Sequence, residues 1–211
     1  MSAAPAEQPY GEAAPPATKT LLDVANEIIE QCPGYRVEII GGQIFVTPPP
    51  DGPHAEALTE LMLPFLAAGL HREKARVLQG IGLWLPDGPY DYAIPDLSVV
   101  DADYKEHLAK FNCYGPLPFR LVLEVTSGNY QADLHVKTTA YANAKVPVYV
   151  IVDRKHNRLH VLTDPAQDDY ATHRLHAPGE LVTLPESIGA KVTLDVAEVL
   201  TAAGKAAAQA E

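Results

Sequence analysis

The sequence lacks the features that define several protein classes. Its 211 residues include only two cysteines, Cys32 and Cys113, which are far apart and have no C-x-x-C spacing. A disulfide framework and a zinc site built from cysteines are therefore excluded, and a reducing, cytoplasmic setting is expected. No run approaches the ~18 apolar residues of a spanning helix, so a membrane protein is not expected. The first residues carry no Lys or Arg and no apolar segment, so no secretory signal is predicted.

Positive charge is also scarce. The chain has 16 Lys and Arg residues against 27 Asp and Glu residues, which gives a formal net charge of −11. This balance argues against a broad basic face for nucleic acid, but a narrow basic groove is compatible with it. Hydrophobic residues make up 47% of the chain, enough to build a core.

The length fits one domain, since domains typically have ~100–200 residues. Residues 1–17 contain four prolines, six alanines and no positive charge, which predicts a disordered leader. Residues 18–201 are predicted to form the folded domain. Residues 202–211 are rich in alanine and are predicted to be a flexible tail.

Apolar periodicity predicts a mixture of helices and strands. Helices are expected over residues 21–32, 53–68, 129–145 and 195–202. Strands are expected over residues 35–40, 43–48, 77–85, 93–100, 119–125, 147–152, 158–162 and 170–175. Because strands precede and follow the helix at 129–145, we predict an α/β or α+β sheet with a central βαβ crossover and additional antiparallel hairpins.

Two acidic residues interrupt apolar strands. Asp96 follows Pro95 and opens one apolar strand, whereas Glu124 lies in a run with hydrophobic neighbours on both faces. Such a run is typical of a strand covered on both sides, where a carboxylate is costly unless it is paired or bound to a cation. A buried ion pair is the alternative for Glu124, and a turn position is the alternative for Asp96. The two carboxylates together favour a functional site.

A third group of residues belongs to the helix predicted after Glu124. Asp133, Lys137 and Tyr141 are spaced four apart, so they are expected along one helical face. This helix begins just beyond the strand that holds Glu124, and its first turns can overhang the carboxylates. An exposed Asp133–Lys137 ion pair is the alternative, but the placement favours a functional role.

These segments resemble the PD-(D/E)xK nuclease superfamily. The resemblance rests on Pro95-Asp96, Glu124-Val125-Thr126-Ser127, the Asp133/Lys137/Tyr141 spacing and the segment from Val146 to Asp153. Within the superfamily, the chain is similar to the bacterial Uma-two family of restriction endonucleases over roughly residues 21–199. The family implies a restriction-endonuclease-like fold, which is a mixed β-sheet flanked by helices.

The resemblance also implies a metal site. Asp96 and Glu124 would bind Mg²⁺, or Mn²⁺ in its place, and a lysine would position or deprotonate the attacking water. Mg²⁺ commonly takes only one or two protein carboxylates, with waters completing its shell. The superfamily lysine stands two residues after the second carboxylate, but this chain has Thr126 there. Lys137 is the predicted substitute, and a chain whose Lys137 cannot reach the metal would be catalytically silent.

Supporting residues follow from the same resemblance. Glu56, on the helix after Pro53, is the candidate for the first acidic residue, and Glu60 is the reserve. His54 stands where the family often has a histidine, although a surface histidine at a helix start is an equal alternative. Asp133 and Tyr141 are assigned supporting roles beside Lys137.

Other motifs carry less weight. His156 and His160 have a zinc-compatible spacing on a helix, but their segment is predicted to be a turn and a strand, which favours surface histidines. His173 and His176 also lack a matching third ligand. No G-x-S-x-G elbow, P-loop or G-x-G-x-x-G is present.

The sequence therefore predicts a Mg²⁺-dependent endonuclease acting on DNA. The alternatives are a catalytically silent relative that binds DNA or a protein partner, and a metal-dependent enzyme acting on another phosphoester. A homodimer is expected because one site per chain cleaves both strands most easily in a pair. The apolar segment 81–85 is a candidate contact surface, or else an ordinary core strand.

Overall fold

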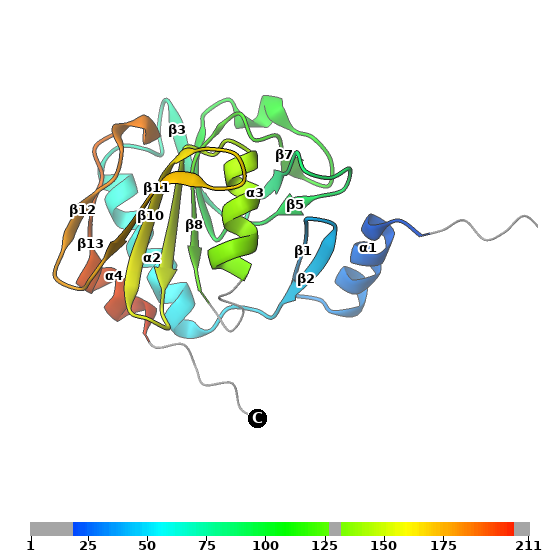
Figure 1. Ribbon diagram of the computed structural model, residues 1–211, viewed down its shortest axis with the longest axis horizontal. Helices are drawn as coiled ribbons and strands as arrows, with labels where there is room; N and C mark the ends of the chain where they lie inside the picture. Colours follow the sequence, from blue (N-terminus) through cyan, green and yellow to red (C-terminus); the bar gives the residue numbers. More distant parts are fainter. Residues whose placement is uncertain (1–18, 127–131, 205–211) are drawn as a thin grey trace, which may run out of the picture.

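The computed structural model describes residues 19–126 and 132–204, in which a six-stranded sheet forms the centre (Figure 1). The predicted leader at 1–17 and the first residues of the helix predicted at 129–145 lie outside the described residues. The strand order is β11-β10-β9-β8-β6-β3. The strands are β3 (Ala75–Gln79), β6 (Leu97–Asp101), β8 (Phe119–Val125), β9 (Val148–Asp153), β10 (Arg158–Pro165) and β11 (Tyr170–His176).

The centre of this sheet contains the predicted crossover. β8 and β9 pair in parallel, while the other neighbouring strands of the sheet pair antiparallel. The chain returns between β8 and β9 through the helix α3 (Lys137–Asn143). The predicted mixed α/β class is therefore confirmed.

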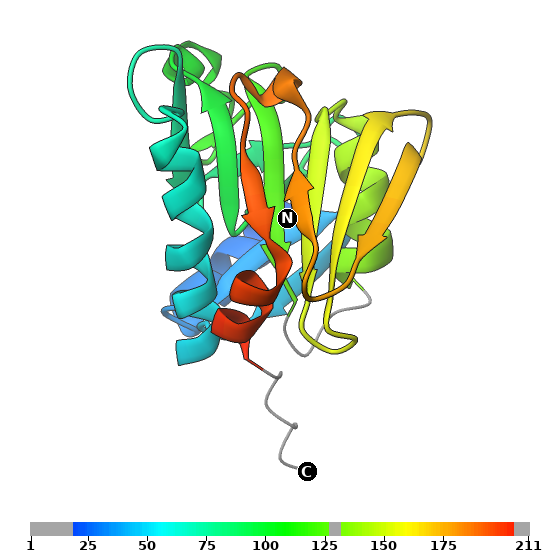
Figure 2. The same ribbon diagram turned by 90° about the vertical axis from the view of Figure 1, so that its left-hand side faces the viewer.

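Helices cover both faces of the large sheet. α2 (Gly52–Ala67) and α4 (Val196–Ala203) lie against one face, and α3 lies on the opposite face (Figure 2). The small pair β12 (Leu181–Thr183) and β13 (Thr193–Asp195) lies on the α2 side. α4 extends to Ala203, slightly beyond the helix end predicted at residue 202. Among the residues described, every helix is too short or too polar to cross a membrane.

A second sheet lies on the α3 side of the molecule. Its order is β2-β1-β5-β4-β7, and the helix α1 (Leu21–Gln31) packs against β1. The strands are β1 (Arg36–Ile40), β2 (Gln43–Thr47), β4 (Gly82–Trp84), β5 (Tyr92–Ala93) and β7 (Cys113–Tyr114). We call it the small sheet.

Two strands predicted as continuous are each divided between the two sheets. The strand expected at 77–85 ends at Gln79 in the large sheet and resumes at Gly82 in the small sheet, because Gly80 turns the chain with φ of 62°. The strand expected at 93–100 is interrupted by Pro95, which has no N–H for a ladder. Asp96 therefore lies where the chain crosses from the small sheet to the large one.

The helix expected after β8 also differs from a regular α-helix. Ala132–Val136 form a π-helical turn, and regular α-helix begins only at Lys137. A π turn changes the angular spacing of its side chains, so the four-residue spacing of Asp133 and Lys137 does not place them as in an α-helix. The side chain of Asp133 lies outside the described part of the structure.

Candidate active site

The two predicted carboxylates lie side by side, with Asp96 just before β6 and Glu124 on β8. β6 and β8 pair with Leu97 opposite Leu123, which places Asp96 beside the end of β8. The backbone N–H of Val125 donates to Oδ2 of Asp96 at 2.8 Å. Asp96 and Glu124 are each only 2% exposed, so both charges need partners inside the protein.

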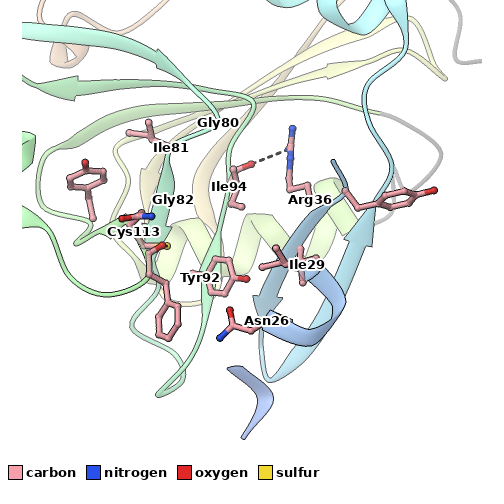
Figure 3. Close-up of a pocket in the computed structure, with 14 residues that line it drawn as sticks. Asn26, Ile29, Arg36, Gly80, Ile81, Gly82, Tyr92, Ile94 and Cys113 are labelled. Carbon is pink, nitrogen blue, oxygen red and sulfur yellow. Dashed lines mark hydrogen bonds between the residues drawn. The ribbon is translucent and has the colours of Figure 1, made fainter. Parts of the chain in front are cut away.

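Arg36 bridges these two carboxylates from the small sheet. Its Nη2 donates to Oδ1 of Asp96 at 2.6 Å, and its Nη1 lies 3.9 Å from Oε2 of Glu124. Nη1 also donates to the carbonyl oxygen of Ile94 at 3.0 Å, as Figure 3 shows. Arg36 thus supplies the positive charge that is missing from the sequence around Asp96 and Glu124. One oxygen of each carboxylate already faces this guanidinium group.

Lys137 reaches Glu124 from the helix side. Its Nζ donates to Oε1 of Glu124 at 2.9 Å and lies 3.2 Å from Oε1 of Glu38. All three side chains are buried. The structure therefore brings together Asp96, Glu124 and Lys137, as the sequence predicts, and adds Glu38 to them.

Tyr141 contacts the same oxygen of Glu124. Its hydroxyl donates to Oε1 at 2.7 Å. Burial raises the pKa of Tyr141 well above its ordinary value, and the negative charge of Glu124 raises it further. Tyr141 is therefore a hydrogen-bond donor that holds the Glu124 carboxylate, alongside Lys137.

His54 approaches Asp96 from the start of α2. Its Nε2 lies 3.2 Å from Oδ2 of Asp96, and the side chain is buried. Burial alone would raise the pKa of Asp96, but the His54 imidazole and the positive charges of Arg36 and Lys137 hold it well below its usual value. Asp96 is therefore charged at neutral pH.

The helix that carries His54 is fixed at its first residue. Asp51 is the N-cap of α2 and accepts a hydrogen bond from the backbone N–H of His54 at 2.8 Å. Arg154, which follows β9, donates to both carboxylate oxygens of Asp51 at 3.2 and 3.0 Å. These bonds position His54 against Asp96.

The acidic residues predicted on α2 do not join this cluster. Glu56 and Glu60 are exposed, whereas the buried carboxylate that shares Lys137 with Glu124 is Glu38 on β1. Glu38 also accepts a hydrogen bond from the backbone N–H of Ile94 at 2.7 Å. The sequence contained a signal for it, because Glu38 interrupts the apolar strand Val37–Ile40 just as Glu124 interrupts β8.

Thr126, at the position where the resemblance to the PD-(D/E)xK superfamily implies a lysine, takes a structural role. Its hydroxyl donates to the carbonyl oxygen of Val152 and accepts from the backbone N–H of Arg154, at 3.2 and 3.0 Å. These bonds join the ends of β8 and β9. The ammonium group beside Glu124 comes instead from Lys137.

The donor set is chemically suited to a hard divalent cation. Three buried carboxylates supply only oxygen ligands, which is the preference of Mg²⁺ and Mn²⁺. Within residues 19–126 and 132–204, no three His, Cys, Asp or Glu side chains are already arranged as a metal site. A cation shared by Asp96 and Glu124 would therefore use two carboxylates and take contacts that Arg36 now makes.

Comparison with protein families identifies the chain. The family model of Uma2, described as "Putative restriction endonuclease", matches residues 25–197. The chain belongs to the Uma2 family. A comparison with curated proteins gives no match.

A solved structure shares the Uma2 fold. The chain is similar to a putative nuclease belonging to DUF820 from Anabaena variabilis ATCC 29413, with a TM-score of 0.60 and 15% sequence identity. The similarity covers 79% of this chain and 90% of the other. At this identity the likeness establishes the nuclease-like fold alone, and the roles of individual residues rest on the geometry above.

One minor prediction needs correction, and one open alternative gains support. His160, expected at the surface, is buried, and its Nδ1 lies 2.9 Å from Nε2 of His173 because β10 and β11 pair. In the segment 81–85, Leu83 and Leu85 are fully buried in the core beside the small sheet. The burial of these two leucines favours the core-strand alternative, and the homodimer stays a prediction that light scattering at tens of micromolar tests.

Proposed function

We propose that this Uma2 protein is a Mg²⁺-dependent endonuclease that hydrolyses phosphodiester bonds in DNA. The observation that carries the proposal is the convergence of Asp96, Glu124 and Lys137, which come from the segment just before β6, from β8 and from α3. Buried charges are costly, and a hydrophobic strand gains nothing in stability from Glu124 that an apolar residue would not supply. A catalytic role would explain why these charged residues are buried together.

Asp96 and Glu124 would hold the metal ion. When bound there, Mg²⁺ would polarise the phosphodiester and make a bound water more acidic. Mn²⁺ accepts the same oxygen ligands and would substitute for it. Tyr141 would keep Oε1 of Glu124 oriented through its 2.7 Å hydrogen bond.

Lys137 would act on the charge of the reacting group. Its Nζ is held between Glu38 and Glu124, so it lies close to any phosphate that approaches these carboxylates. A positive charge in a water-poor site stabilises the charge that develops on a phosphoryl group. Glu38 would position Lys137, because it contacts the same ammonium group as Glu124 does.

The test is cleavage by the full-length protein. Supercoiled plasmid, linear duplex and single-stranded DNA would be incubated with Mg²⁺, with Mn²⁺ and with EDTA. The proposal expects cleavage with either metal, none with EDTA, and none with Asp96→Asn. Cleavage that persists at full rate in Asp96→Asn would refute the site.

A silent DNA-binding protein is the second candidate. Two observations favour it: Thr126 stands in place of the superfamily lysine, and Arg36 already pairs with both carboxylates. This alternative expects no Mg²⁺ or Mn²⁺ binding by calorimetry. A salt-dependent mobility shift would then separate a DNA-binding protein from a protein scaffold.

A further inference from the structure

A pocket of about 520 Å³ lies beside the candidate active site (Figure 3). It is bounded by α1, by the start of β1, and by the chain around β4, β5 and β7. Arg36 lines the pocket and also contacts Asp96 and Glu124. Only the side chain of Arg36 would therefore separate a molecule in the pocket from the carboxylates of Asp96 and Glu124.

The lining of this pocket combines a buried apolar floor with polar groups near its rim. Val37, Tyr92 and Cys113 are buried, whereas Asn26 and Asn112 bring side-chain amides. An amide both donates and accepts hydrogen bonds, as the polar edge of a nucleobase does. The pocket is therefore suited to a flat, partly apolar group with a polar edge.

Phe111 stands at the rim in an unfavourable backbone conformation. Phe111 and Asn112 have φ of 53° and 56°, in a two-residue turn closed by the bond from Cys113 N–H to the carbonyl oxygen of Lys110 at 2.8 Å. Turns with two positive φ angles favour Asn and Gly, and a bulky aromatic residue there is strained. Strain of this kind tends to be kept at ligand-binding sites.

The ring of Phe111 also forms an aromatic pair with Trp84 at the protein surface. Phe111 is 49% exposed. Its ring lies nearly parallel to the Trp84 indole, with 6.4 Å between centroids and 12° between planes. The ammonium group of Lys110 lies over the same indole at 5.9 Å. An exposed aromatic ring with a lysine beside it is typical of proteins that bind single-stranded nucleic acid by stacking.

We propose that this pocket receives an unstacked nucleobase of the substrate strand, with Phe111 as the stacking platform. The inference rests on the proposed function, and it specifies the substrate as DNA with unpaired nucleotides. The phosphate of the bound nucleotide would lie toward Arg36, whose guanidinium group contacts Asp96. Because every base has an aromatic face, the pocket would tolerate different sequences.

Trp84 makes the test direct, because it is the single tryptophan of the chain. Its fluorescence would be titrated with a ten-nucleotide oligothymidylate and with a ten-base-pair duplex, using full-length protein and Ca²⁺ in place of Mg²⁺. The proposal expects saturable quenching with at least tenfold higher affinity for the single strand. Base–aromatic stacking contributes about 1–3 kcal/mol per base, which corresponds to roughly 5- to 150-fold in affinity.

Variants of Phe111 separate binding from folding. Phe111→Asn removes the ring and suits the left-handed turn, so we expect a higher melting temperature together with at least tenfold weaker binding of the oligothymidylate. Phe111→Tyr keeps the ring and is expected to retain the affinity. Leu181→Asn, which removes a 70% exposed apolar side chain on β12, is the matched control and is expected to change neither property.

The outcomes distinguish this inference from the nuclease proposal. Equal affinity for single strand and duplex, with Phe111→Asn unchanged, would overturn the pocket even if the wild type cleaves DNA. Quenching that depends on Phe111 in a protein that cleaves no DNA would support the pocket and reject the endonuclease. Absence of both quenching and cleavage would reject both.

Discussion

Lys137 and Glu124, thirteen residues apart in the sequence, form a buried ion pair with 2.9 Å between Nζ and Oε1. The pair is part of a larger network, because Lys137 also contacts Glu38 and Glu124 also faces Arg36. They come together because α3 lies against the large sheet beside β8. Each charge in this network therefore influences both the stability of the fold and the candidate chemistry.

Replacing Lys137 is expected to affect activity and stability separately. Lys137→Ala should reduce DNA cleavage by ~100-fold or more while metal binding is retained. It should also lower the free energy of unfolding by about 3–5 kcal/mol, because two buried carboxylates lose a partner. Single-turnover cleavage and urea denaturation measure the two effects.

A second substitution distinguishes these effects. Adding Glu38→Gln to Lys137→Ala removes one of the unpaired charges, so part of the lost stability should return while activity stays low. If Lys137→Ala cleaves DNA at the wild-type rate, α3 serves only as a scaffold.

Removing one carboxylate is expected to abolish metal binding. In Asp96→Asn the cation would lose one of its two protein ligands, so calorimetry should detect no binding of Mg²⁺ or Mn²⁺ at millimolar concentration. Glu56→Gln is the matched control, because Glu56 is an exposed acidic residue near the same region. Unchanged metal binding in Asp96→Asn, or loss of metal binding in Glu56→Gln, would show that the metal ion binds elsewhere.

Arg36 is expected to compete with the metal ion. Because its guanidinium contacts both Asp96 and Glu124, Arg36→Gln removes a positive charge from the place a cation would occupy. We expect Mn²⁺ affinity to rise by about tenfold, which corresponds to ~1.4 kcal/mol. Calorimetric titration of wild type and variant measures the change, and weaker Mn²⁺ binding in Arg36→Gln would show that Arg36 supports the metal site instead.

Mild acid is expected to destabilise the protein through His160. Burial lowers the pKa of His160 from its ordinary 6.5, and the neighbouring His173 lowers it further, although Asp153 acts in the opposite direction. Below pH 6.5 the unfolded chain therefore binds a proton that the folded protein does not, and the free energy of unfolding falls as the pH decreases. The stability is fully present above that range.

Melting temperatures at pH 7.5 and 5.5 check this expectation. His160→Gln should reduce the difference between the two values, whereas Lys155→Gln, in the turn before β10, should leave it unchanged. A wild type that is equally stable at both values would show that Asp153 compensates fully.

The sequence predicted the parts of the site that follow local pattern. Asp96 and Glu124 interrupt apolar strands, and the helix after Glu124 carries Lys137, so their meeting follows from strand order and a crossover. Glu38 follows the same pattern on β1, whereas the resemblance to the family pointed to Glu56 on α2, which is exposed. The interruption of an apolar strand by an acidic residue is therefore the signal that Glu38 shares with Glu124.

Other features depend on contacts that local sequence does not encode. Arg36 reaches Asp96 across sixty residues of chain, through the pairing of β1 with β5. The division of segment 77–85 between two sheets depends on Gly80, whose positive φ is permitted but not required by its residue type. His160 is buried because β9 and β11 pair on either side of β10.

The crossing of the chain at Pro95 has a thermodynamic consequence. Arg36 and Glu38 belong to the small sheet and Glu124 belongs to the large sheet, with Asp96 at the crossing between them, so the charge network also joins the two sheets. A cation that took Asp96 and Glu124 from Arg36 would remove one of the links between the sheets. Metal affinity and the docking of the small sheet would then be linked with opposite signs: a change that weakens the docking would raise the metal affinity, and a bound ion would weaken the docking by the same free energy.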